Sequence, residues 1–277
     1  MTSSIFLGLT TFTYLLCMAL YFSFSFFRNR KFGNVLTATV ILGLFFNTIG
    51  LGLRWYESYK IGFGHIPLSN LYEALVSLSW TTVILYLFVE YRYKTKSLGI
   101  LIFPLVSMAM AYASFSSDIQ SEIQPLLPAL QSNWLTYHVI TCFLAYSAFV
   151  VSFGVSIIYL FKAGKKEDSD STSFFPALLS LDEIIYKTVA IGFPLLSLGI
   201  ITGAVWANYA WGTYWSWDPK ETWSLITWFV YAAFLHARLT RGWRGKRSAI
   251  LSIVGFGSVM FTFLGVNFLL SGLHSYA

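Results

Sequence analysis

The stretch Trp206-Ala-Asn-Tyr-Ala-Trp211-Gly-Thr-Tyr-Trp215-Ser-Trp217-Asp218-Pro-Lys-Glu221-Thr-Trp223 joins two long apolar segments. Six of the ten tryptophans fall between positions 206 and 228, including Trp228 beyond the quoted stretch. Tryptophan settles at the headgroup level of membrane proteins, but an ordinary belt spreads its rings over all the helix ends. Because one junction holds most of these rings, the pattern predicts a flat aromatic surface at a membrane boundary.

The end of this stretch also has the pattern of a helix start. Asp218 fits the N-cap position, Pro219 the first helical position and Glu221 the third, so both carboxylates can accept the free N–H groups of a first turn. We therefore interpret Asp218 and Glu221 as helix caps in preference to acid/base catalysts. Capping leaves the tryptophans unexplained.

Composition places the chain in a membrane. Of its 277 residues, 56% are hydrophobic and 11% charged, with a mean hydropathy of +0.65, whereas a soluble domain carries about a quarter charged residues. The net charge of +6 then reflects orientation in the lipid bilayer, and no nucleic-acid partner is expected. Cys17 and Cys142 lie far apart in apolar runs, which argues against thiol redox chemistry and cysteine metal sites.

Segments of about twenty apolar residues span a bilayer as helices, and the sequence predicts an all-α polytopic membrane protein with about eight of them. The first run lacks a basic n-region and a small-residue cleavage site, so we expect a retained helix. The predicted spans are 4–27, 34–55, 70–91, 98–115, 134–161, 184–207, 220–239 and 248–271.

The loops predict the orientation. Fifteen of the 18 Lys and Arg residues fall in the loops on one side, which the positive-inside rule makes the cytoplasm. Both termini and the tryptophan stretch 206–228 then face the outer, periplasmic or lumenal, side. We expect residues 162–180 to form a cytoplasmic connector, residues 116–133 to form a short helix on the outer surface, and 1–277 to form one domain.

The four histidines differ in predicted depth. His138, one turn into the fifth helix, and His274, just after the eighth, flank the outer tryptophans. Imidazoles ligate haem iron axially and aromatic rings cover a porphyrin, so this pair suits a flat macrocycle with a central iron. His236 lies about 22 Å from Glu221 at 1.5 Å per helical residue, too far to share that iron. It is either a separate functional residue or bonded to a backbone carbonyl. His65 lies in an outer loop.

The tryptophan stretch resembles the "WWD" signature of haem-handling membrane proteins, and its Asp-Pro-Lys-Glu-Thr-Trp ending is most similar to the CcsA (ResC) branch of cytochrome c maturation. The resemblance implies that His138 and His274 are the axial ligands of haem b at an outer site, and that His236 ligates an inner haem whose other ligand comes from a partner. The residues that it implies in haem contact are Trp211, Gly212, Trp215, Trp217, Asp218, Pro219, Glu221 and Trp223.

A second stretch is similar to another motif of the same family, through His65, Pro67, Asn70 and Glu73. Asn70 as N-cap with Glu73 three residues later predicts a capping box at the start of the third helix. The motif has no chemical role that the residues reveal, and we expect it to be structural or to line the outer pocket.

The function implied by the resemblance is to bind haem and present it to the Cys-x-x-Cys-His segment of an apocytochrome c, with haem export left open. The implied partners are a CcsB (ResB)-type membrane protein, without which any lyase activity is not expected, and a thiol-reducing thioredoxin-like protein. The implied location is the bacterial inner membrane, in preference to the thylakoid membrane. A fixed-haem electron-transfer subunit and a small-molecule transporter are the alternatives. Eight helices argue against a CcmC-type protein, and the short chain argues against a CcmF-type protein.

Overall fold

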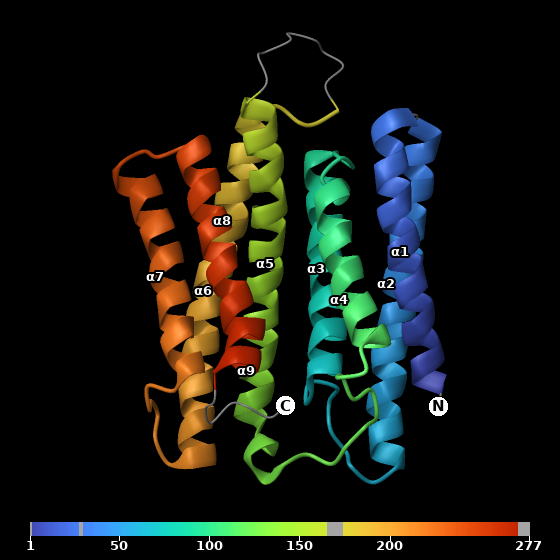
Figure 1. Cartoon of the computed structure of the whole chain (residues 1–277), viewed down its shortest axis with the longest axis vertical. Coiled ribbons are helices and arrows are strands. Elements are labelled where there is room, and N and C mark those ends of the chain that lie inside the picture. The colour runs from blue at the N-terminus through green and yellow to red at the C-terminus, as the bar shows by residue number, and fades with distance from the viewer. Residues whose placement is uncertain (1, 28–29, 165–173, 271–277) are drawn as a thin grey trace. The chain divides into compact units, whose positions relative to one another are not determined.

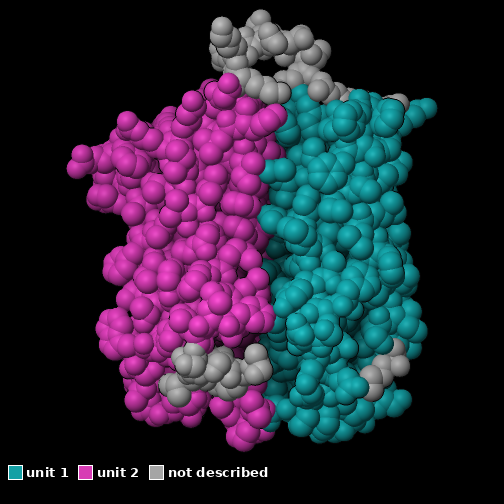
Figure 2. Space-filling view, in the orientation of Figure 1, with its two compact units in different colours: residues 1–126, 169–176 teal, residues 127–168, 177–277 magenta. Residues whose placement is uncertain are grey.

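A computed structural model of the chain describes residues 2–27, 30–164 and 174–270. The described residues form helices and loops without any strand, which confirms the predicted all-α class (Figure 1). They fall into two compact units, one of residues 1–126 and 169–176, the other of residues 127–168 and 177–277 (Figure 2). The prediction of one domain over the whole chain stays a prediction.

Unit 1 is a ring of four helices in which each helix packs on two others. Helix α1 packs on α2 and α4, and α3 completes the ring through its own contacts with α2 and α4. Tyr14, Tyr21, Tyr86 and Phe103 fill the interior and are all fully buried. The four helices are α1 (Thr2–Phe27), α2 (Arg30–Lys60), α3 (Leu71–Tyr93) and α4 (Gly99–Phe115).

Unit 2 repeats this ring arrangement. Helix α5 packs on α6 and α8, and α7 packs on α6 and α8. Phe149 of α5 stacks on Tyr231 of α7 with ring centroids 3.6 Å apart. The elements are the 3-10 turn η1 (Pro128–Leu130), α5 (Asn133–Ala163), α6 (Leu178–Trp211), α7 (Pro219–Thr240), α8 (Lys246–Met260), the π-helical segment η2 (Phe261–Gly265) and α9 (Val266–Leu269).

Each of the eight predicted spans contains a helix, and the eighth is interrupted by η2. Within the described residues, six helices are long and apolar enough to cross a membrane: α1, α2, α3, α5, α6 and the run from Lys246 to Leu269. Helix α4 has the same apolar character over 17 residues, and α7 is not among the six. The chain is therefore a multi-pass membrane protein, and the side that each end faces stays a prediction.

The predicted surface helix over residues 116–133 is wrong. This segment is irregular except for η1, because its backbone carbonyls bond to side chains of unit 1 in place of a helical ladder. Arg54 Nη1 donates to the carbonyl of Ser121 at 2.8 Å, and the Nε2 atom of His65 lies 2.9 Å from the carbonyl of Gln124. Residues 165–173 of the predicted connector 162–180 lie outside the described residues.

Candidate functional site

His138 lies in the second turn of α5, against α6. Its Nδ1 atom is 2.7 Å from the carbonyl oxygen of Gly199. A carbonyl oxygen only accepts hydrogen bonds, so Nδ1 carries the proton and Nε2 keeps its lone pair. Among the described residues, none makes a hydrogen bond to Nε2. A metal-binding histidine has this arrangement, because a backbone carbonyl fixes the tautomer and the orientation of the ring.

Two glycines of α6 make room for side chains of α5, Gly203 for the His138 imidazole and Gly199 for the Cys142 thiol. A Cβ atom on Gly203 would lie 2.6 Å from His138 Nδ1, and one on Gly199 would lie 2.6 Å from Cys142 Sγ. Small residues spaced by four positions let two membrane helices approach closely. The His138 ring also stacks on Trp206, with centroids 6.3 Å apart and planes 16° from parallel.

Trp206 itself is part of the helix packing and not of the loop surface. It is buried, and its indole N–H donates to the carbonyl of Ala129 in η1 at 2.8 Å. Trp228 likewise turns into unit 2, where its indole N–H donates to the hydroxyl of Ser197 at 2.8 Å. Trp206 therefore joins η1 to α6 beside His138, and Trp228 joins α7 to α6.

The tryptophans between α6 and α7 form a folded loop, so the predicted flat surface is wrong. Helix α6 ends at Trp211, and Gly212 takes a left-handed conformation with φ of 79°. The rings of Trp215 and Trp217 are 5.7 Å apart and cross at 89°. Trp217 is 68% exposed, so its ring remains available to a ligand or partner.

Trp217 has a strained backbone. Its φ is +60°, a conformation that costs an L-residue roughly 1–2 kcal/mol and that collects at functional sites. The Glu221 carboxylate holds the strained segment, accepting from the N–H of Ser216 at 2.8 Å and of Asp218 at 3.2 Å. The Asp218 side chain accepts in return from the first turn of α7, which confirms the predicted capping box.

The last described residues of the chain approach the same end of α7. Thr262 of η2 donates to the carbonyl of Trp223 at 3.2 Å, and Phe261 lies against the Trp223 ring at 4.1 Å. Lys220 Nζ donates to Asn267 Oδ1 of α9 at 2.9 Å. His274 lies outside the described residues, four positions after Leu270.

Comparisons with known proteins identify the family of this chain. Residues 68–274 match the family described as cytochrome C assembly protein. The cytochrome c biogenesis protein CcsA of Guillardia theta is 44% identical over 86% of this chain and 84% of its own. The CcsA protein of Heterosigma akashiwo is 41% identical over 95% of this chain and 91% of its own.

The chain belongs to the cytochrome c assembly protein family. Among solved structures, the cytochrome c heme lyase CcmF is similar in fold, with a TM-score of 0.70 and 17% sequence identity. The match covers 95% of this chain and 46% of the CcmF chain, so this family member spans about half the length of that protein.

His236 of this cytochrome c assembly protein lies toward the opposite end of α7 from Trp223. Its side chain is exposed, and among the described residues its ring makes no hydrogen bond. The alternative of a ring bonded to a backbone carbonyl is therefore not observed in this part of the chain. Helices α6 and α7 are joined at this end by a bidentate ion pair of Arg238 with Asp182, with contacts of 2.9 and 2.7 Å.

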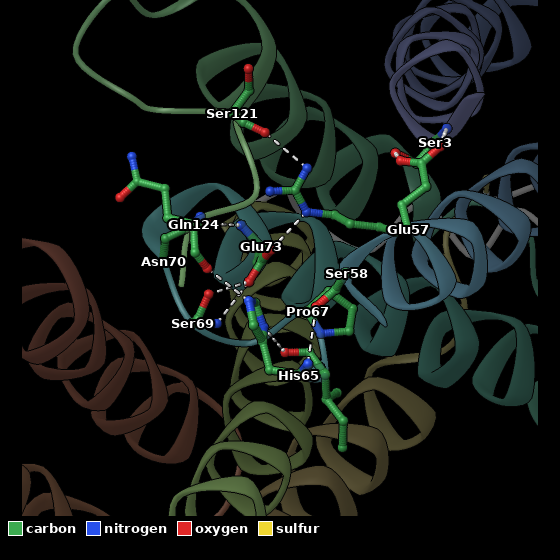
Figure 3. Close-up of polar contacts among 12 residues, drawn as sticks. Ser3, Glu57, Ser58, His65, Pro67, Ser69, Asn70, Glu73, Ser121 and Gln124 are labelled. Atoms are coloured by element: carbon green, nitrogen blue, oxygen red, sulfur yellow. Dashed lines mark hydrogen bonds and ion pairs between the residues drawn. The ribbon is translucent and has the colours of Figure 1, made fainter. Parts of the chain in front are cut away.

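The second motif of this family member lies in unit 1, where it closes a polar cluster between α2 and α3 (Figure 3). Asn70 caps α3 by accepting from the N–H of Glu73 at 2.9 Å. The Glu73 carboxylate does not accept from the backbone N–H of Asn70, as it would in a capping box. It accepts instead from Ser69 N–H at 2.8 Å and from Arg54 Nε at 2.7 Å.

His65 is held at both ring nitrogens. Nδ1 lies 3.0 Å from the carbonyl of Ile66 and Nε2 lies 2.9 Å from the carbonyl of Gln124. The ring is buried, and its backbone N–H donates to the Ser58 hydroxyl at 2.9 Å. Neither nitrogen is open to iron, and the carbonyl of Pro67 accepts from Ser77 at 3.4 Å. The geometry thus favours the structural role for this motif.

Several residues around His138 escape prediction from the sequence. Gly203 makes room for the imidazole and the carbonyl of Gly199 accepts its hydrogen bond. The spacing of the two glycines is the signal that could have found them. Lys220 belongs to the recognised signature, but only the structure aims it at Asn267. The π-helical segment that brings Asn267 there leaves no pattern in the sequence.

Proposed function

We propose that this c-type cytochrome biogenesis protein binds haem at the end of unit 2 that contains His138 and presents it for attachment to an apocytochrome c. The observation that carries the proposal is the His138 imidazole, whose Nδ1–H donates to Gly199 and whose Nε2 keeps a lone pair. Neutral imidazole nitrogens ligate haem iron, so the histidine has the tautomer and the fixed orientation that an axial ligand needs.

His274 is the proposed second ligand. It follows α9 by a few residues, and the contacts of Thr262 with Trp223 and of Asn267 with Lys220 hold the preceding chain beside α7. The exposed Trp217 ring and the rest of the tryptophan loop would cover one edge of haem b. The signature residues Trp211, Gly212, Trp215, Asp218, Pro219, Glu221 and Trp223 form or support that loop.

The chemistry of attachment belongs to haem and to the thiols of its acceptor, so the protein supplies binding, orientation and protection. A Cys-x-x-Cys-His segment brings its own histidine, which would displace one axial ligand as the cysteines react. Cys17 and Cys142 are both buried and unpaired. Reduction of the acceptor thiols therefore requires another protein, for which we propose a thioredoxin-like reductant.

The proposed partner is a CcsB (ResB)-type membrane protein. His236 supports it, because an exposed histidine on a helix of a membrane protein suits an inner haem whose second ligand comes from another subunit. The relatives named above come from algae. Their source supports the thylakoid membrane over the bacterial inner membrane that the sequence favours.

The test is the visible absorption spectrum of the full chain purified with its CcsB-type partner. We expect a low-spin bis-histidine haem spectrum that is lost or changed in His138→Gly, and partly restored by added imidazole because the vacated position admits a free ligand. His65→Gln is the matched control, since both nitrogens of His65 already face carbonyls. A haem-free complex, or a spectrum that His138→Gly leaves unchanged, would refute the proposal.

A further inference from the structure

Lys220 carries a positive charge in an unfavourable place. It is the second residue of α7, where the helix dipole is positive and repels a cation. Its side chain is only half-exposed. In residues 2–27, 30–164 and 174–270, no carboxylate forms an ion pair with it. Asp218 attracts the ammonium electrostatically but does not contact it. A partly buried charge that no carboxylate contacts directly is costly, so an anion bound beside it would complete the site.

The neutral partner of Lys220 is itself held in place. Asn267 donates through Nδ2 to the carbonyl of Phe263 at 3.2 Å, so its Oδ1 faces the ammonium at 2.9 Å. The π-helical segment η2 directly precedes α9 and changes the helical register before Asn267. Such segments occur frequently at functional sites. The amide therefore orients the ammonium without neutralising it.

The ammonium lies within electrostatic range of the proposed haem ligand. Lys220 lies close enough to interact electrostatically with both His138 and Cys142 of α5, and Cys142 Sγ is 3.7 Å from His138 Nδ1. The carboxylates next to Lys220 in sequence are already used by the tryptophan loop, where Asp218 caps α7 and Glu221 binds Ser216.

We propose that Lys220 pairs with a propionate of haem bound at His138 and that its charge stabilises the ferrous state. This inference rests on the proposed function. Haem carries two propionate carboxylates, which supply the anion that Lys220 lacks. A cation beside the iron disfavours the extra positive charge of ferric haem, so it raises the reduction potential. Lys220 is thus a positioning residue for haem that remains reduced until transfer.

The experiment is a redox titration of the full chain with its CcsB-type partner, with haem bound. In Lys220→Gln we expect the ratio of ferrous to ferric haem at fixed potential to fall about tenfold, which is 59 mV for one electron. Lys220→Arg retains the charge and stays near the unmodified protein. Lys246→Gln is the matched control, because Lys246 also begins a helix of unit 2 but is exposed and distant along the chain.

Haem dimethyl ester, in which both propionates are methylated, separates the contact from the charge alone. In the unmodified protein we expect the ester to be retained less tightly than haem. In Lys220→Gln the ester and haem are retained alike, because the contact is already lost. Asn267→Leu leaves the ammonium in place but unoriented. We therefore expect its preference for haem over the ester to lie between those of the unmodified protein and Lys220→Gln.

The outcomes distinguish this inference from the proposed function. If Lys220→Gln keeps the bis-histidine spectrum and has the potential of Lys246→Gln, the inference is overturned while haem binding at His138 stands. If Lys220→Gln prefers haem over the ester as strongly as the unmodified protein does, the propionate contact is likewise overturned. A complex without haem overturns the proposed function and this inference with it.

Discussion

The two units use their buried polar groups in opposite ways. In unit 1, Arg54 pairs with the Glu73 carboxylate, and both ring nitrogens of His65 lie against backbone carbonyls. In unit 2, His138 is fixed through one nitrogen and the described residues leave the other open, while Lys220 Nζ bonds to a neutral amide. A histidine is therefore closed off by structural contacts in one unit and keeps one nitrogen for the proposed ligand in the other.

The largest effect is expected from breaking the closed cluster of unit 1. Arg54→Met leaves the Glu73 carboxylate buried without its cation, because both side chains are at most 5% exposed. Removing one partner of a buried pair costs about 3–5 kcal/mol, to be measured by thermal unfolding in detergent. Adding Glu73→Gln recovers part of this loss, because it removes the unpaired charge.

Arg92→Met is the matched control for that change, since Arg92 is an exposed arginine of the same unit. We expect the Arg54→Met protein that remains folded to bind haem with an unchanged bis-histidine spectrum. If Arg54→Met unfolds at the same temperature as Arg92→Met, the cluster is not what stabilises unit 1 and the comparison between the units fails.

A smaller effect is expected from closing the open site of unit 2. In Gly203→Ala the new methyl group would lie 2.6 Å from His138 Nδ1 and displace the ring from Gly199. Overpacking of this kind costs roughly 1–3 kcal/mol, so we expect about 10- to 100-fold weaker haem binding, measured by haem titration. Gly257→Ala has open space around the new methyl group and should bind as the unmodified protein does.

The smallest effect concerns the strained residue of the loop. Trp217→Gly and Trp217→Ala remove the same exposed ring, so both should lower the yield of holocytochrome c to the same degree. Only glycine adopts the φ of +60° without strain, and we expect the glycine variant to be more stable by about 1 kcal/mol. Equal unfolding temperatures for the two variants would show that Glu221 does not hold the backbone in this conformation.

The sequence predicts what depends on local pattern. The eight helices follow from apolar length, and the cap of α7 follows from the order of Asp218, Pro219 and Glu221. Tertiary contacts decide the rest. The segment 116–133 is not helical because Arg54 and His65 take its carbonyls. Trp206 and Trp228 turn inward because Ala129 and Ser197 accept from their indoles.

The site itself divides in the same way. The sequence names His138, and the tautomer that suits it to the proposed role of ligand depends on a carbonyl 61 positions away in α6. The close approach of α5 and α6 is encoded by Gly199 and Gly203, which attract attention only once the facing residue is known. No sequence pattern predicts η2, since a π-helical turn has the composition of the helix that contains it.

If haem binds at His138 as proposed, the hydrogen bond from His138 to Gly199 also bears on how fast haem would leave. A ring that is held in place before iron binds loses little freedom on binding, and it needs no rearrangement when iron departs. The lifetime of the complex is then governed by the iron–nitrogen bond and by the competing imidazole of the acceptor. After each proposed transfer the ring would already be in position for the next haem, so the proposed site would be regenerated without a conformational cycle.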